Sequence, residues 1–501
     1  MQIKSNLKQK INTRKQIKKL SKSQFNENKV IDYFLQISKI PRVSGNEKII
    51  ALWLEQQFKK LNCSSVTRDE SNNVFATFNA TKGFEHLPIL MLQAHSDMIG
   101  VKTDNSKHNF KRDPINVFEE NGWLKAKDTS LGADNGIGIA TILCLLSDDS
   151  INHGPLEILI TSQEENGMHG VKAFNYNLIK AKYLINLDSE NDRDIIIGCG
   201  GGSIIDSTSN VIRENVDMKD KLCFELTISG LLGGHSAMSI NDKRLNAIKL
   251  MGHFLDSYQK NNFIQLIDIE AGEIANVIPN TCSAKFLIDK NDELFFKDFI
   301  ENQKIKIKKI YPLEKKLEVK ILSTKTSRKP FIKKHSFEAI KFLNEVFDGV
   351  KVFNKKYNQI QASSNFGVLK TTENVFIAVF NTRDIVRKSK LETNRWILKA
   401  LKKIKAEIKI HGGDGWNQEL KIPKIAKEFK RFTKLHSKLN IKYSFTTGGL
   451  EIKHLVKNAK SLDSAFSYGA TIVDPHSTNE KALISSIRTV YGLIAKFLQF
   501  I

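Results

Sequence analysis

Residues 87–98, LPILMLQAHSDM, decide the fold of this chain. The apolar run predicts a buried strand, and polar residues follow it at once. Two further apolar runs are followed by acidic residues in the same way, in LEILITSQEENGM and AKYLINLDSE. Open α/β sheets place their chemistry at the carboxyl ends of such strands. The polar residues at the three predicted strand ends are His95, Asp97, Glu164, Glu165 and Asp188.

These residues supply imidazole and carboxylate groups but no thiolate. Such donors are typical of hydrolytic metal sites, whereas structural zinc sites usually include cysteine. Asp97 lies two positions after His95, so both side chains can face one pocket, with the carboxylate orienting the imidazole. An H-x-D pair is common, however, and a core or surface histidine is the alternative.

The adjacent acids Glu164 and Glu165 form the sharpest local signal. Neighbouring residues at a strand end point to opposite sides, so one acid can bind metal while the other faces the substrate. The second acid would act as general base and acid on a water molecule. A solvated charge pair is the alternative, but the buried strand just before the pair argues against it.

Two segments outside the strand ends add candidate ligands. In LGADNGIG, Asp134 lies among glycines at the start of a predicted helix, where a carboxylate can bridge two metal ions. A helix N-cap is the simpler interpretation of Asp134 taken alone. His476 lies in DPHSTNE near the C-terminus. Together with the strand-end residues, these two complete a donor set that predicts a two-metal hydrolase site.

The order of predicted elements indicates an α/β fold. Strands alternate with helices to about residue 205, which favours a mostly parallel sheet with helices on both faces. After GCGGGS, strands and helices segregate over about 200 residues, as in an inserted α+β domain. A third segment from about residue 413 returns to helix and strand. A chain of 501 residues is also long enough for two domains.

Composition limits the class of protein. No apolar stretch reaches the roughly 20 residues that span a bilayer. The net charge of +23 comes mainly from lysines dispersed along the chain. A nucleic-acid surface would cluster its charge and favour arginine, so no specific nucleic-acid partner and no membrane partner are expected. Five cysteines without CxxC spacing indicate free thiols in a reducing compartment.

The N-terminal segment is strongly basic. Its first 26 residues contain eight Lys or Arg and no acid. We expect residues 1–25 to form a basic extension of a cytoplasmic protein, because no apolar secretion signal is present. An organellar targeting peptide is the alternative, since such peptides are also basic and poor in acids.

A series of longer motifs runs along the chain. They are, in order, QAHSDM, WLKAKDTSLGADNGIGIA, HGPLEILIT with EE and GM, LINLDSE, IGCGGG, GLLGGHS, NVIP, SSNFGV and DPHSTNE. By these motifs the chain, from about residue 29 to its end, resembles the aminoacyl-histidine dipeptidases, also called cytosol nonspecific dipeptidases, of the zinc aminoacylase/carboxypeptidase superfamily. The resemblance implies a catalytic domain of residues 26–203 and 413–501, interrupted by a lid domain of residues 204–412.

The resemblance also implies roles for the predicted site residues. One zinc would be held by His95 and Asp188, a second by Glu165 and His476, and Asp134 would bridge them. Asp97 would support His95, and Glu164 would be the general base. Manganese or cobalt would suit the same nitrogen and oxygen donors.

In the lid, His235 would help to bind the oxyanion or the substrate. Asn276 and Arg383 would hold the free carboxylate of a dipeptide, for which a guanidinium fork is well shaped. Lid domains commonly form the dimer contact in this superfamily, so a homodimer is implied.

The chain departs from the family pattern at three places. Asp128 is followed by Thr129 where the family has glycine, Gln163 replaces a frequent aspartate, and Thr447 replaces a histidine. Glu451, close to Thr447, remains and could pair with the ammonium group of the substrate. None of these changes removes a predicted ligand or the predicted base, so they bear on specificity and rate.

The expected function is therefore hydrolysis of dipeptides, Xaa-His and others, by a di-zinc metallopeptidase. An amidase, deacylase or carboxypeptidase that acts on N-acyl amino acids is the alternative within enzymes. A binding protein with a decayed site is a second alternative, but such a site would be expected to lose some of its ligands.

Overall fold

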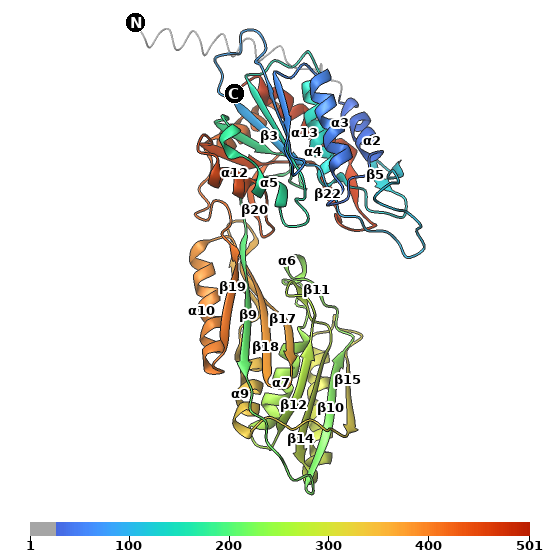
Figure 1. Cartoon of the computed structure of the whole chain (residues 1–501), viewed down its shortest axis with the longest axis vertical. Coiled ribbons are helices and arrows are strands. Elements are labelled where there is room, and N and C mark those ends of the chain that lie inside the picture. The colour runs from blue at the N-terminus through green and yellow to red at the C-terminus, as the bar shows by residue number, and fades with distance from the viewer. Residues whose placement is uncertain (1–26) are drawn as a thin grey trace. The chain divides into compact units, whose positions relative to one another are not determined.

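The computed structural model describes residues 27–501, and the chain divides into two compact units (Figure 1). The first unit contains the described residues up to Ile197, with Lys421–Ser444 and Leu450–Ile501. The inserted unit contains Gly198–Leu420 and Phe445–Gly449. The sequence prediction placed the limits of the insertion at residues 204 and 412. The basic extension predicted for residues 1–25 lies outside the described residues.

An eight-stranded sheet forms the centre of the first unit. In spatial order its strands are β1 (Ser65–Arg68), β2 (Val74–Phe78), β6 (Leu156–Thr161), β3 (Leu90–His95), β7 (Tyr183–Asn186), β21 (Ser464–Ser467), β8 (Asp194–Cys199) and β20 (Lys442–Thr446). The central strands pair in parallel, β6 with β3, β3 with β7 and β7 with β21. The pairs β1–β2, β2–β6 and β8–β21 are antiparallel. The predicted α/β class is confirmed, with parallel pairing confined to the centre.

Helices cover both faces of this sheet. Every residue of the four central strands is buried, which explains why their sequences are largely apolar. Helix α4 packs against β3, and α11 packs against β21. The helices are α2 (Lys29–Ser38), α3 (Lys48–Lys60), α4 (Ala133–Leu146), α5 (His169–Ala173), α11 (Lys424–His436), α12 (Ile452–Asn458) and α13 (Ile484–Leu498), with a 3₁₀ turn at Tyr176–Leu178.

A second, four-stranded sheet joins distant parts of the first unit. Its order is β22 (Ile472–Val473), β23 (Lys481–Leu483), β5 (Trp123–Ala126) and β4 (Val117–Glu120). The loop between β22 and β23 carries His476, and Asp134 lies at the start of α4, soon after β5. Because β23 pairs with β5, the C-terminal loop is held close to the segment that contains Asp134.

The inserted unit is an α+β structure on a nine-stranded antiparallel sheet. The order is β15 (Glu318–Thr324), β10 (Lys221–Ser229), β14 (Cys282–Asp289), β12 (Gln265–Ala271), β17 (Gln359–Thr371), β18 (Val375–Asp384), β9 (Gly201–Asn210) and β19 (Glu407–Gly413), with β16 (Gly349–Asn354) beside β17. Alternate residues of β18 are buried, so one face of the sheet carries the core and the other is partly exposed.

The helices of the inserted unit pack on the buried face of its sheet through a core rich in phenylalanine. They are α7 (Ala247–Gln259), α8 (Glu293–Ile310), α9 (Lys333–Glu345) and α10 (Arg387–Lys403), with a 3₁₀ turn at Lys290–Asp292. A short helix, α6 (Ser236–Ser239), completes the set. β11 (Gly234–His235) and β13 (Val277–Ile278) form a short antiparallel ribbon. The lysine-rich middle, which the sequence left unassigned, forms α8, β15, α9, β16 and β17.

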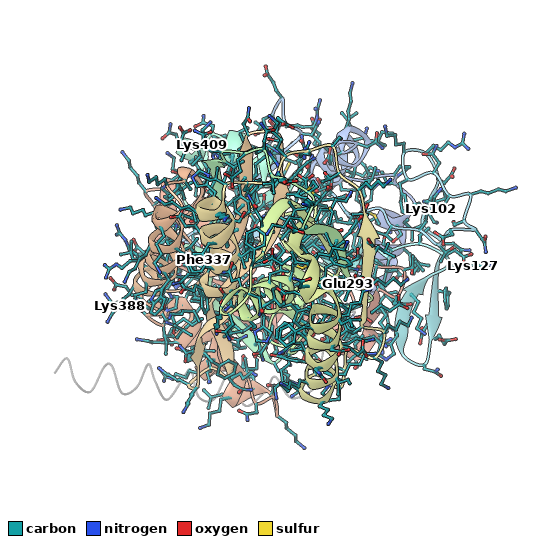
Figure 2. The ribbon with its side chains drawn as sticks, turned by 90° about the horizontal axis from the view of Figure 1, so that it is seen from below. Lys102, Lys127, Glu293, Phe337, Lys388 and Lys409 are labelled. Atoms are coloured by element: carbon teal, nitrogen blue, oxygen red, sulfur yellow. The ribbon has the colours of Figure 1, made fainter. Side chains whose placement is uncertain are left out.

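The basic charge is distributed over both units. Lys102 and Lys127 of the first unit and Lys388 and Lys409 of the inserted unit are exposed, and Figure 2 shows their side chains extending from the ribbon. Within the described part of the chain, no helix has the length and apolar character needed to cross a membrane.

Candidate active site

The first predicted group of metal donors forms where β3 and β7 end. His95 is the last residue of β3, and Asp188 lies two positions after β7. The strands are parallel neighbours, so their ends meet at one edge of the sheet. His95 Nε2 lies 3.3 Å from Asp188 Oδ1 and 3.1 Å from Asp134 Oδ1. The donor atoms of these three residues lie within 4.8 Å of one another, close enough for one ion.

The second predicted group forms around His476. Its Nε2 atom lies 2.7 Å from Glu165 Oε1 and 3.3 Å from Asp134 Oδ2. These donors also lie within 4.8 Å of one another. Asp134 thus presents one oxygen to His95 and the other to His476. This is the arrangement that a carboxylate bridging two ions requires.

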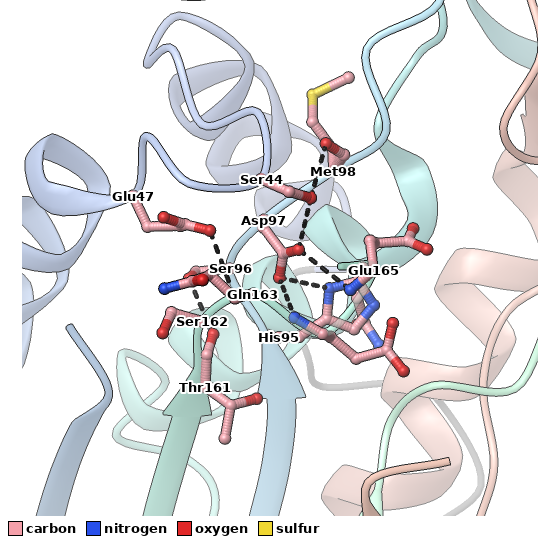
Figure 3. A network of polar contacts seen from close by, with 12 residues as sticks. Ser44, Glu47, His95, Ser96, Asp97, Met98, Thr161, Ser162, Gln163 and Glu165 are labelled. Carbon is pink, nitrogen blue, oxygen red and sulfur yellow. Dashed lines mark hydrogen bonds and ion pairs between the residues drawn. The ribbon is translucent and has the colours of Figure 1, made fainter. Parts of the chain in front are cut away.

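Asp97 organises the residues around the first group (Figure 3). Its Oδ1 atom accepts a hydrogen bond from the N–H of Glu164 at 2.9 Å and lies 3.4 Å from His95 Nδ1. Its Oδ2 atom accepts from the N–H of Glu165 at 3.1 Å and from the Ser44 hydroxyl at 2.7 Å. Although burial alone would raise it, the bonds from His95 and these donors lower the pKa of Asp97. One carboxylate therefore fixes both the imidazole and the two neighbouring acids.

Glu164 and Glu165 lie in a turn, not on the strand itself. Strand β6 ends at Thr161, and the Glu164 carbonyl accepts the N–H groups of Gly167 at 3.1 Å and Met168 at 2.8 Å. The turn, instead of strand alternation, therefore directs the two side chains. Burial raises the pKa of Glu164 well above its ordinary value, against the opposing effect of His95. A carboxyl group with a raised pKa holds a proton more readily than a solvated glutamate does.

The electrostatics of the cluster fit bound divalent cations. Several carboxylates are gathered in the interior, which is costly unless positive charge offsets them. The buried guanidinium of Arg42 donates to backbone carbonyls and not to these carboxylates. The donors in the described residues are nitrogen and oxygen atoms, and the five cysteines belong to none of the groups. Zinc, manganese or cobalt would suit this set.

Glu451, predicted to contact the substrate ammonium, belongs to a buried group of hydrogen-bonded polar side chains. Its side chain is fully buried, and its Oε2 atom accepts from Gln93 Nε2 at 2.6 Å and from the Thr161 hydroxyl. Asn186 Nδ2 donates in turn to Gln93 Oε1. Burial raises the pKa of Glu451 to about 8. Its contacts here are with the protein, and its role toward a substrate stays a prediction.

Two of the predicted lid residues lie together in the inserted unit. Asn276 Nδ2 lies 3.3 Å from His235 Nε2, and the pairing of β11 with β13 sets His235 opposite Val277. Asn365 Nδ2 donates to the carbonyls of Ala275 and Val277, both at 2.8 Å. This amide holds the backbone on either side of Asn276. Sequence reasoning gave Asn365 no role, although it lies in the motif SSNFGV.

The third predicted lid residue, Arg383, lies on β18. Its backbone is paired with Gly202 of β9 and Ser363 of β17, so it belongs to the middle of the sheet. Within the described residues its buried Nε atom makes no hydrogen bond. Burial lowers the pKa of the guanidinium, which nevertheless stays charged at neutral pH. An unsatisfied buried guanidinium nitrogen is suited to bind a carboxylate.

Sequence reasoning also missed two buried charged residues beside the cluster. Arg42 is 2% exposed and Glu480 is 4% exposed, and both bind the backbone of the site. Charged side chains are rarely buried to this extent. In the sequence, only their positions could have indicated such a role. Arg42 directly follows the proline after the first predicted helix, and Glu480 is the last residue of DPHSTNE.

Comparisons with known proteins show similarity to peptidases over most of the chain. A family model described as a peptidase dimerisation domain, M20_dimer, matches residues 226–315 of the inserted unit. The cytosol non-specific dipeptidase of Escherichia coli (strain K12) is 32% identical over 485 residues, which cover 95% of this chain and 98% of that protein.

Solved structures extend the similarity to the fold. The aminoacylhistidine dipeptidase of Vibrio alginolyticus superposes with a TM-score of 0.81 at 27% identity, covering 96% of this chain and 98% of that one. The aminopeptidase PepT of Bacillus cereus ATCC 10987 has a TM-score of 0.54 at 13% identity, covering 95% of this chain and 98% of that one. At that identity, the second likeness concerns the fold alone.

Proposed function

This chain belongs to the cytosol non-specific dipeptidase family of M20 metallopeptidases and is a peptide hydrolase, and we propose that it cleaves dipeptides, Xaa-His among them, with broad specificity. The observation that carries the proposal is the position of Asp134. Its two oxygens face different histidines, 3.1 Å from His95 Nε2 and 3.3 Å from His476 Nε2.

Two divalent ions, zinc being the first candidate, would be held by this cluster. His95 and Asp188 would bind one, Glu165 and His476 the other, and Asp134 both. When bound, such a pair of ions polarises a carbonyl group and makes a water molecule more acidic. Asp97 would keep the His95 ring oriented, since it lies 3.4 Å from the second ring nitrogen.

Glu164 would move the protons of the reaction. It would take a proton from the attacking water and return it to the nitrogen of the leaving amine. Its raised pKa supports this role, because the carboxyl group must both accept and release a proton. Asp97 holds the backbone N–H of Glu164 at 2.9 Å, which would limit movement of the base.

The remaining predicted site residues would bind the ends of the substrate. Arg383 and Asn276 would bind the free carboxylate, His235 would bind the oxyanion or the substrate, and Glu451 of the first unit would contact the ammonium group. A site that binds both the free amino group and the free carboxylate of a dipeptide excludes longer peptides. The matched dimerisation domain supports a homodimer formed through the inserted unit, and the name of the Escherichia coli relative supports a cytosolic location.

The test is a turnover assay of the metal-loaded enzyme on a panel of dipeptides, with N-acetylated and C-amidated versions as controls. We expect cleavage of the free dipeptides alone. Glu164→Ala should lower kcat by roughly 10²–10⁴-fold with unchanged metal content, as loss of a general base does. Near-normal turnover of that variant would exclude the assigned mechanism. Equal cleavage of N-acetylated and free substrates would indicate a deacylase or carboxypeptidase instead.

A further inference from the structure

The Glu480 carboxylate binds the turn that carries Asp134. Its Oε2 atom accepts the N–H groups of Leu131 at 2.7 Å and Gly132 at 2.9 Å. Its Oε1 atom accepts those of Ala133 at 2.8 Å and Asp134 at 3.3 Å. Four consecutive backbone N–H groups thus bind one buried carboxylate. The last of them belongs to Asp134, whose side chain lies between His95 and His476.

The guanidinium of Arg42 binds the same turn through its carbonyl side. Its Nη2 group donates to the Gly132 carbonyl, and its Nη1 group donates to the carbonyls of Ser96 and Asp97, both at 3.0 Å. Arg42 therefore ties the Asp134 turn to the segment that follows His95. Burial lowers its pKa to about 10, so it keeps its charge at neutral pH and remains a favourable neighbour for Glu480.

The turn packs closely against Arg42. Gly132 adopts a φ of +68°, and a Cβ atom there would lie 2.6 Å from Arg42 Nη2 and 2.7 Å from Met98 Sδ. A Cβ atom at Gly136 would lie 2.7 Å from the same nitrogen. The backbone around Asp134 is thus held from both sides, by the carboxylate and by the guanidinium.

We propose that Glu480 and Arg42 form a clamp that positions the Asp134 carboxylate for two metal ions at once. Glu480 lies four residues after His476, so one loop supplies a ligand of the second ion and also fixes the shared ligand. Both are positioning residues, because they bind the backbone of the turn and not the predicted donor atoms. The inference rests on the proposed metal pair.

A matched control exists in the same unit. Glu157 on β6 is 3% exposed and also accepts backbone amides, from Lys180 at 2.9 Å and Ala181 at 3.0 Å. These amides precede β7 and belong to none of the donor groups in the described residues. Glu157→Gln therefore removes the same kind of buried interaction without touching the Asp134 turn.

The experiment compares Glu480→Gln and Glu157→Gln in the full chain, first stripped of metal and then titrated with Mn²⁺ by calorimetry. In Glu480→Gln the new amide group faces backbone N–H donors, so the turn must shift. We expect Mn²⁺ affinity to fall by about 10–100-fold, as for loss of groups that orient metal ligands, and kcat to fall with little change in KM. Glu157→Gln should lower Tm to a similar extent and leave Mn²⁺ affinity within about two-fold.

The proposal is overturned if both variants bind Mn²⁺ as the wild type does, or if both lose affinity equally. Glu480→Asp, which keeps the charge but shortens the side chain, should give an intermediate affinity and keeps the test informative if Glu480→Gln does not fold. A wild type that binds Mn²⁺ but cleaves no dipeptide would refute the proposed function, while the titrations would still decide the role of the clamp.

Discussion

The metal-donor cluster of the first unit and the predicted substrate residues of the inserted unit differ in how their side chains are held. In the cluster His95 is 1% exposed, Asp97 accepts three hydrogen bonds, and Glu480 binds the turn that carries Asp134, although His476 is exposed. In the inserted unit His235 is also exposed, and the buried Nε atom of Arg383 makes no hydrogen bond within the described residues.

This difference separates two tasks. Groups that must hold ions at fixed distances are preorganised, because their own neighbours have already restricted them. Arg383, which is predicted to meet the substrate, has a buried Nε atom that makes no hydrogen bond within the described residues. Changes to the predicted metal donors should therefore alter metal content and kcat, whereas changes to the predicted substrate residues of the inserted unit should alter KM and leave metal content intact.

The largest effect is expected for Asp134→Ala, which removes the carboxylate shared by both donor groups. We expect metal content measured by mass spectrometry to fall for both ions and kcat to fall by about 10³-fold or more. Asp188→Ala is the matched comparison, because Asp188 belongs to only one group and should affect mainly one ion. Full metal content in Asp134→Ala would show that the carboxylate is not shared.

Acid should weaken metal binding steeply. Without metal, neighbouring acids raise the pKa of His95, and hydrogen bonds to Asp134 and Glu165 raise that of His476 to about 11. A ring with a raised pKa holds its proton more firmly and must release that proton to bind metal. Affinity should fall by up to about ten-fold per pH unit for each proton released. Calorimetry in buffers of different ionisation enthalpy would count those protons, and a pH-independent affinity would refute the assignment of both rings.

Removing Arg383 should change substrate binding without changing metal content. Arg383→Ala is expected to raise KM for free dipeptides by roughly 10–100-fold, the effect of losing a hydrogen bond to a charged group. Arg383→Lys should give an intermediate KM, because lysine keeps the charge but lacks the fork. An unchanged KM would exclude the carboxylate role.

The smallest effect is expected for Asn365→Ala. This change removes both amide bonds that hold the backbone around Asn276, and we expect KM to rise by roughly 3–10-fold. Metal content should be unaffected. A lower metal content in this variant would contradict the separation of the two tasks.

The sequence predicted the site residues that lie at or just after the ends of strands. His95 and Asp188 could be placed together because buried strands are visible as apolar runs and parallel strands end at one edge. Asp134 and His476 could be paired only through family resemblance, since the joining of β23 to β5 involves short strands with weak patterns. Arg42 and Glu480 were not predicted, because the sequence alone does not distinguish a charged side chain that is buried against backbone groups from one that is exposed to solvent.

The fold, like the site, could be predicted only in part from the sequence. The buried parallel centre of the first unit was clear, but its antiparallel margins were not. In the inserted unit, lysines on exposed faces of α8 and β15 masked the apolar periodicity, so these elements went unrecognised.

The most direct test of the two-metal account is turnover of a dipeptide by the metal-stripped full chain as Zn²⁺ or Mn²⁺ is added back. We expect the stripped chain to be inactive and activity to be complete when two ions are bound per chain. Full activity without metal, or activity that saturates with one ion and is unaffected by Asp134→Ala, would contradict it.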